Sequence, residues 1–147
     1  MNTADKITQD LGESMKAGTA DVTGVLRLIK TSLKNEQIKL GHELSDDEAL
    51  KVITKEAKQR RDSITAYETA DRADLADIEK AELVIIERYL PKQMSEDELA
   101  KVVDDVLAET GATTKAQMGQ VMGLVMKKTV GAADGGMVSR IVGSKLV

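Results

Sequence analysis

Rows of lysine and arginine are the side chains of this sequence that could do chemistry, and that chemistry is the binding of phosphate. Lys51, Lys55 and Lys58 have the i, i+4, i+7 spacing that places side chains on one face of a helix. A similar row of three cations occupies residues 27–34. Such rows can contact the phosphates of a nucleic acid. The alternative is a solvated helix face that has no partner.

The C-terminal part of the chain supplies a second set of candidate cations. Lys127 and Lys128 end a predicted helix, where positive charge is favourable with or without a ligand. Arg140 and Lys145 follow in the last predicted helix. A few such contacts give modest, salt-sensitive affinity through counterion release.

Two adjacent arginines in the segment KQRRDSITAY have a different role. The apolar stripe of their predicted helix includes position 60, so we expect Arg60 on the buried face and Arg61 about 100° away. A buried guanidinium requires a carboxylate, and Glu56 lies four residues earlier, in the favourable orientation for a helix pair. Further acids follow in the next helix. We therefore predict a structural ion pair between Arg60 and Glu56.

Catalytic and metal-binding side chains are scarce. The chain has no cysteine and one histidine, His42, in a polar connection between helices. No nucleophilic triad built on histidine is visible, and the paired carboxylates fall in helix caps or on exposed faces. We expect no catalytic residue, no metal site and no cofactor. A minor enzyme that uses His42 with a neighbouring acid is the weakest alternative.

A methionine stripe marks the C-terminal part. Met118, Met122 and Met126 share one helix face, and Gly119 and Gly123 form a pair of small residues on another. Tight helix packing through the glycines is the first interpretation. The second is an adaptable groove for a protein partner, because methionine adjusts to many surfaces.

The elements that position these residues are helices throughout. Tyr67 and Tyr89 are the only aromatic residues of the 147-residue chain, which argues against stacking of unpaired RNA bases. Ser45 with Glu48, and Ser95 with Glu98, form capping boxes, and Ile7, Leu11 and Met15 form the apolar stripe of the first helix. Helices are predicted over residues 3–18, 21–40, from 45 to a break near 69–74, 72–90, 95–111, 114–128 and after Asp134.

Three blocks of the sequence are specific in combination, namely KQRRDSI, YLPKQ and MGQVM. In these blocks, and in order over nearly the whole chain, the sequence resembles the GatB/YqeY family, in particular its free-standing YqeY-like members. The resemblance implies an N-terminal helical domain and a smaller C-terminal one. The tail departs from the family pattern at Lys127, which takes the place of a proline, and at Ala132 and Gly136, next to a turn that is commonly basic.

The function implied by this resemblance concerns tRNA. The related tail of the tRNA-dependent amidotransferase B subunit helps to hold tRNA while Glu-tRNA(Gln) or Asp-tRNA(Asn) is amidated. Family labels therefore give carbon–nitrogen ligase activity with glutamine as amido donor. The amidase site belongs to another subunit, and the kinase-like step belongs to a cradle domain that free-standing members lack. The resemblance implies a module that binds tRNA without catalysing a reaction.

We therefore predict an all-α protein with a multi-helix domain over residues 1–92 and a three-helix tail domain over residues 93–147. The leading hypothesis is binding of the tRNA backbone, mainly through the four cations of the tail, with Lys51, Lys55 and Lys58 as a secondary patch. The alternative is a protein–protein adaptor that uses the methionine face without RNA. The net charge of −4 argues against general binding of nucleic acid, including DNA. No apolar run is long enough for a membrane span, and the polar N-terminus predicts a cytoplasmic protein.

Overall fold

Left-handed glycines end three of the helices and set the lengths of the elements. Gly41 (φ 77°) follows the second helix and Gly111 (φ 66°) follows the fifth, and each donates its N–H to a carbonyl of the preceding turn. A residue with a Cβ is strained in this conformation, whereas glycine adopts it freely. A computed structural model describes residues 1–130 and 132–147. In these residues the elements are α1 (Thr3–Ala17), α2 (Ala20–Leu40), α3 (Asp46–Thr69), α4 (Ala73–Glu87), α5 (Glu96–Thr110), a 3₁₀ turn (Lys115–Gln117), α6 (Met118–Lys128) and α7 (Gly135–Lys145).

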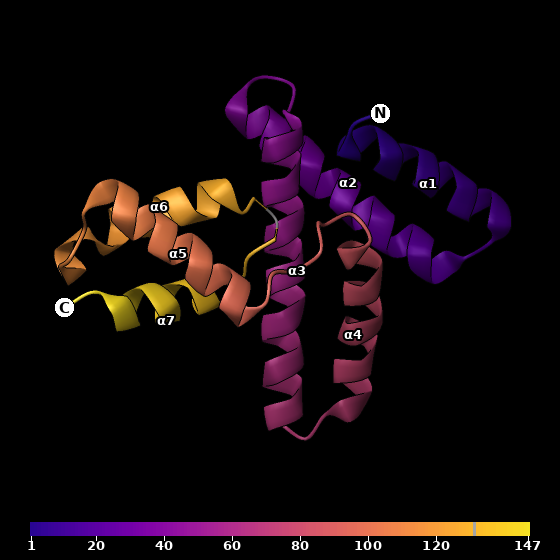
Figure 1. Ribbon diagram of the computed structural model, residues 1–147. Coiled ribbons are helices and arrows are strands. Elements are labelled where there is room, and N and C mark those ends of the chain that lie inside the picture. The colour runs from indigo at the N-terminus through magenta and orange to yellow at the C-terminus, as the bar shows by residue number, and fades with distance from the viewer. Residues whose placement is uncertain (131) are drawn as a thin grey trace. The chain divides into compact units, whose positions relative to one another are not determined.

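The predicted all-α class is confirmed, since the described residues contain helices and no strand (Figure 1). The chain divides into two compact units, Met1–Leu90 and Pro91–Val147. The first holds α1 to α4 and the second holds α5 to α7. The segment 83–90, whose β-branched residues also suit a strand, continues α4 to Glu87.

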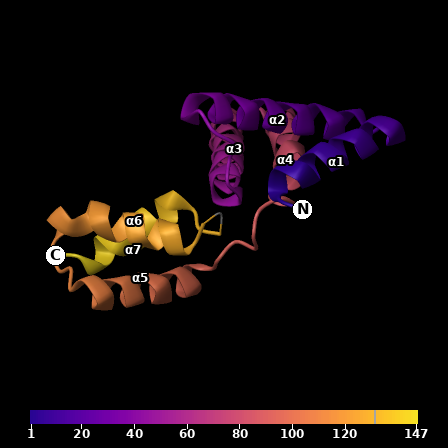
Figure 2. The ribbon, with the colours of Figure 1, turned by 90° about the horizontal axis from the view of Figure 1, so that it is seen from above.

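In the first unit, α1 packs along α2, and α3 and α4 form an antiparallel pair beneath them (Figures 1 and 2). Both views show α3 and α4 side by side. Ile7, Leu26, Ile29, Ile53 and Ile86 are fully buried and form the centre of the core. This core holds α3 and α4 in the positions from which their charged side chains act.

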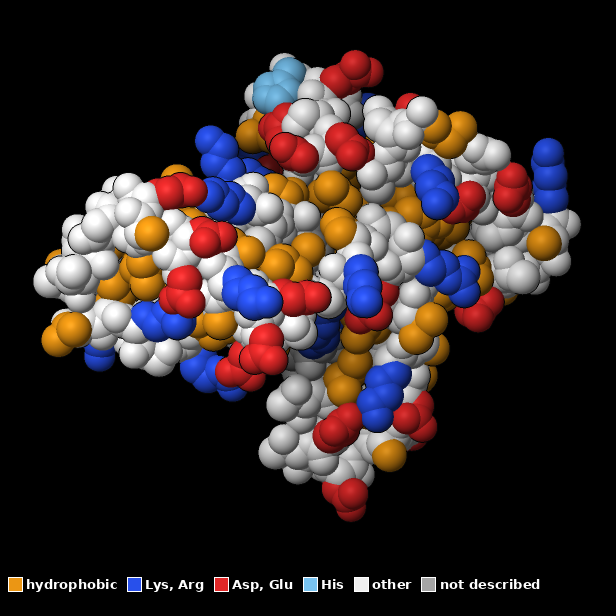
Figure 3. Space-filling view, viewed as in Figure 1, with side chains coloured by type: hydrophobic (Ala, Val, Ile, Leu, Met, Phe, Trp, Pro, Cys, Tyr) orange, Lys and Arg blue, Asp and Glu red, His pale blue; other side chains and the backbone are white. Residues whose placement is uncertain are grey.

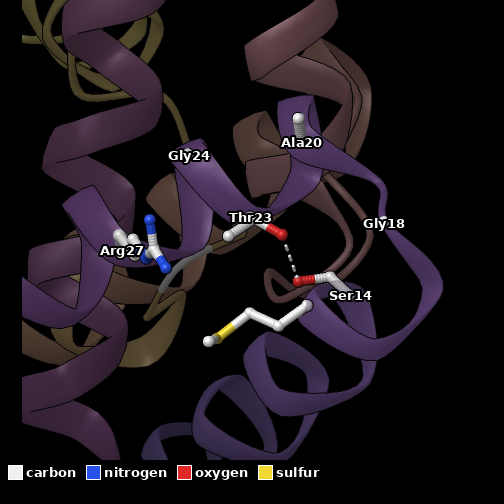
Figure 4. Close-up of a pocket in the computed structure, with 7 residues that line it drawn as sticks. Ser14, Gly18, Ala20, Thr23, Gly24 and Arg27 are labelled. Carbon is white, nitrogen blue, oxygen red and sulfur yellow. Dashed lines mark hydrogen bonds between the residues drawn. The ribbon is translucent and has the colours of Figure 1, made fainter.

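The predicted stripe of α1 is wrong at its last position. Met15 is 54% exposed, and Ser14 takes its place on the buried face. At 100° per residue, position 14 continues the direction of Ile7 and Leu11, whereas position 15 turns away from it. The Ser14 hydroxyl lies 2.8 Å from Thr23 Oγ1 and donates to the Leu11 carbonyl, so this buried polar group is satisfied (Figure 4).

The second unit is a three-helix bundle. Its core consists mainly of valines and leucines from all three helices, including Leu99, Val103, Val121, Val125 and Val142. The close backbone approach predicted for Gly119 and Gly123 is wrong. A Cβ added at either glycine meets nothing within 4 Å, because both residues lie on the exposed side of α6.

Candidate nucleic-acid interface

The lysine row of α3 lies on the solvent side of the helix. Lys51, Lys55 and Lys58 are exposed and point away from Ile53 and Ala57, which face the core. Lys58 Nζ is 3.0 Å from Asp62 Oδ2, one turn later. In the described part of the chain, neither Lys51 nor Lys55 has a carboxylate oxygen within 4 Å of its amino group. These two lysines therefore keep their charge available for an external anion.

Most of the candidate cations in the tail are paired with α5. Lys128 Nζ contacts Glu109, Arg140 Nη2 lies 3.2 Å from Glu96 Oε1, and Lys145 Nζ lies 2.8 Å from Asp104 Oδ1. All three pairs are on the surface and contribute little to stability, yet each places a negative charge beside the cation. A phosphate must compete with that carboxylate.

Lys127 is the exception in the tail. It is exposed at the end of α6, and no carboxylate among residues 1–130 and 132–147 lies within ion-pair distance of it. The second basic row, Arg27, Lys30 and Lys34 on α2, is also exposed and forms no ion pair within the described residues. Figure 3 shows blue and red side chains interspersed on the viewed face of each unit.

Arg60 lies between α3 and α4, in a cluster of carboxylates. Its Nη1 donates to Glu56 Oε2 at 2.8 Å, and its Nε donates to Glu82 Oε2 at 3.1 Å. Glu79 Oε2 lies 3.8 Å from the same Nε. The Arg60 side chain is only 12% exposed. Three carboxylates around one largely buried guanidinium form a clasp between two helices, and their negative charge disfavours a phosphate there.

Arg61 is less buried and makes one longer contact. Its Nη2 lies 3.4 Å from Glu87 Oε1, with 31% of the arginine side chain exposed. Both arginines therefore connect α3 to α4, but only Arg60 does so from a largely buried position.

His42 and its neighbours give no catalytic arrangement that we can assign. His42 is exposed; its Nδ1 lies 2.7 Å from the Glu43 carbonyl and its Nε2 lies 3.6 Å from Glu48 Oε2. The Ser45 N–H donates to Glu48 Oε1 at 3.1 Å, and this hydrogen bond lowers the pKa of Glu48, while the Glu48 N–H donates to the Ser45 hydroxyl oxygen. This carboxylate is engaged in starting α3. Among the described residues, no group of three or more His, Asp or Glu side chains is placed to hold a metal ion.

The methionine face does not form an exposed patch. Met118, Met122 and Met126 are half-buried and pack against the core of the second unit, and Val121 and Val125 occupy the fully buried positions of α6. Only part of each methionine side chain is therefore accessible to a protein partner. None of the described helices has the length and apolar character needed to cross a membrane.

The ion pairs of the tail are the feature that sequence reasoning missed. The acids of α5 are spaced at positions 96, 104 and 109, and the cations that they meet are on other helices. The signal available in the sequence was the acidic character of α5. Which cations this helix neutralises depends on how α6 and α7 pack against it.

The sequence of this chain matches a known protein family. The model of the family described as Yqey-like protein matches residues 4–146. The chain is 30% identical to "altered inheritance of mitochondria protein 41, mitochondrial" of Meyerozyma guilliermondii, over 96% of this chain and 69% of that protein. The protein of the same name from Pyrenophora tritici-repentis is 29% identical, over 95% of this chain and 81% of its own length. The one from Saccharomyces cerevisiae is 27% identical, over 82% and 69%. The chain belongs to the YqeY-like family.

Proposed function

We propose that this protein is a tRNA-associated module that binds the phosphate backbone and does not itself catalyse a reaction. The observation that carries the proposal is the sorting of its cations by ion pairing. Lys51, Lys55 and Lys127 are exposed without a carboxylate within 4 Å in the described residues, whereas Arg60 and Arg61 are engaged between helices. We assign the first phosphate contacts to these three lysines, and the α2 row, which is also unpaired, is a further candidate.

The paired cations contribute less. Lys58, Lys128, Arg140 and Lys145 each have a carboxylate at ion-pair distance. Phosphate binding to these side chains replaces one anion by another, so little is gained. The tail set is therefore reduced to Lys127 as its main contact, and the α3 row becomes the stronger of the two surfaces.

The resemblance to the tail of the amidotransferase B subunit supports tRNA as the nucleic acid. The ligase activity attached to that family describes complexes in which other domains carry the catalytic sites. The names of these relatives refer to mitochondria, whereas the polar N-terminus predicts a cytoplasmic protein. Both compartments contain tRNA, so the proposal is compatible with either.

Fluorescence anisotropy of labelled bulk tRNA tests the proposal. The first variant neutralises the unpaired set, Lys51→Gln, Lys55→Gln and Lys127→Gln. The matched control neutralises three paired lysines, Lys58→Gln, Lys128→Gln and Lys145→Gln, and so changes the net charge equally. We expect the first variant to lose affinity by about tenfold or more and the control to lose much less. Equal losses would show that only the overall charge matters and would contradict the assignment.

A further inference from the structure

A groove of about 560 Å³ lies beside α1, within the first unit. One of its walls is a face of α1, and another is the segment Arg88–Tyr89 that follows α4. The start of α2 contributes Thr19 and Val22. The volume is in the range of small-molecule sites. No residue assigned to phosphate binding lines this groove, so it is separate from the candidate nucleic-acid interface.

Charged side chains of both signs line the groove. Lys6, Asp10 and Glu13 have the i, i+4, i+7 spacing that places side chains on one face of a helix. Arg88 joins them from the segment after α4. Two cations and two carboxylates therefore surround one groove, and their formal charges cancel.

These four charges are not paired with one another. In the described part of the chain, none of the four side chains forms an ion pair within 4 Å. Asp10 accepts the hydrogen bond of the Tyr89 hydroxyl, and Glu13 accepts one from the exposed Gln9 amide at 3.2 Å. The Arg88 guanidinium has no hydrogen-bond partner among the described residues. The groove thus offers an unused donor group and a carboxylate that no cation neutralises.

Both cations lie near the half-buried ring of Tyr89. Lys6 Nζ lies 6.0 Å from the centre of this ring. Burial is the main influence that raises the pKa of Tyr89, whereas the nearby positive charge of Arg88 lowers it. The hydrogen bond to Asp10 holds the ring in place. An anionic group that enters the groove therefore meets Arg88 beside an anchored ring.

We propose that this groove binds a free α-amino acid in its zwitterionic form. The Arg88 guanidinium binds the carboxylate, because its paired N–H donors match the two oxygens. Glu13 binds the ammonium group. Ala17 and Val22 also line the groove and give a small apolar side chain of the amino acid its contact.

The balance of charges favours a zwitterion over a simple ion. An anion that pairs with Arg88 is repelled by Asp10 and Glu13. A cation that pairs with Glu13 is repelled by Lys6 and Arg88. Each simple ion thus gains one attraction and keeps a repulsion. An α-amino acid carries both charges in one small molecule and pairs with both sides of the groove.

Titration of the isotope-labelled whole chain with L-alanine, followed by amide NMR spectra, tests the proposal. Exposed ion pairs are weak, so we expect a dissociation constant of about 0.1–5 mM. Amides of α1, of the start of α2 and of Arg88–Tyr89 should shift saturably, whereas those of α5 to α7 should not. Acetate and methylammonium each carry one of the two charges and should bind about fivefold more weakly or worse. Absence of saturable shifts up to about 50 mM alanine, or equal affinity for acetate, would overturn the proposal.

Two variants test the assigned contacts. Arg88→Gln and Glu13→Gln each remove one of the two pairs and should weaken alanine binding by about fivefold or more. Lys16→Gln is the matched control, because this exposed lysine is also on α1 but does not line the groove, and it should bind alanine like the wild type. Circular dichroism establishes that each variant is folded. Unchanged binding in Arg88→Gln, or an equal loss in Lys16→Gln, would contradict the arrangement.

Discussion

The Tyr89 hydroxyl donates a hydrogen bond of 2.6 Å to Asp10 Oδ2, which joins the segment after α4 to α1 across 79 positions of sequence. Lys6 Nζ lies 6.0 Å from the centre of the same ring. Burial raises the pKa of Tyr89 above its usual value of 10.0, and the hydrogen bond to Asp10 raises it further. One of the two tyrosines in the chain is thus engaged in holding the first unit together.

Tyr89→Phe should lower the free energy of unfolding by about 1 kcal/mol near neutral pH, because it removes a hydrogen bond to a carboxylate that is partly exposed. The stabilisation from Tyr89 should also depend on pH. Since the folded pKa lies above the unfolded one, this contribution is complete below about pH 10 and is lost as the pH rises through the folded pKa. Urea unfolding at about pH 8 and pH 10.5 measures both effects.

Tyr67→Phe is the control, because it removes the other tyrosine and keeps the contact between Tyr89 and Asp10. The wild type and Tyr67→Phe should lose more stability between the two pH values than Tyr89→Phe does. An identical pH dependence in all three proteins would show that Tyr89 is not the group responsible.

Arg60→Ala should lower the free energy of unfolding by about 3 kcal/mol, because three carboxylates then face one another without a cation in a partly buried site. Arg61→Ala is the matched control, with one contact from a more exposed position, and should change stability by about 0–1 kcal/mol. Chemical denaturation of both variants gives the comparison. Similar losses for the two arginines would contradict the distinction between a buried clasp and a surface pair.

Gly123→Ala should stabilise the second unit by about 1 kcal/mol, because the position is helical and a Cβ has open space around it. Gly111→Ala should have the opposite effect and destabilise by about 1 kcal/mol, because φ is +66° there. Thermal unfolding measures both changes. A loss of stability in Gly123→Ala would contradict this expectation and would indicate that another helix packs closely against this glycine.

The helix starts could be predicted from the sequence because their contacts are local. In both capping boxes, Ser45 with Glu48 and Ser95 with Glu98, the side chains and backbone N–H groups that bond lie within four consecutive residues. The same holds for Gly41, which follows the last residue of the second predicted helix and donates its N–H to the Gln37 carbonyl four residues earlier. A contact between residues this close in sequence does not depend on how the helices pack.

The remaining features depend on packing. The apolar residues alone predict that Met15 lies on the buried face of α1. In the structure Ser14 takes this buried position, because its hydroxyl forms a hydrogen bond with Thr23 of α2. The pairing of Arg140 with Glu96 spans two helices, and neither residue indicates the other in the sequence. The sequence therefore does not distinguish a free cation from one that is paired across two helices. For this reason it favours the tail over the α3 row as the main phosphate-binding set.

The salt dependence of tRNA binding tests the central claim most directly. If three unpaired lysines make the phosphate contacts, a plot of log K against log salt concentration should have a slope of about −2 to −3 for the wild type. The Lys51→Gln/Lys55→Gln/Lys127→Gln variant should have a clearly shallower slope. Absence of saturable binding at low salt, or an unchanged slope in that variant, would contradict the account.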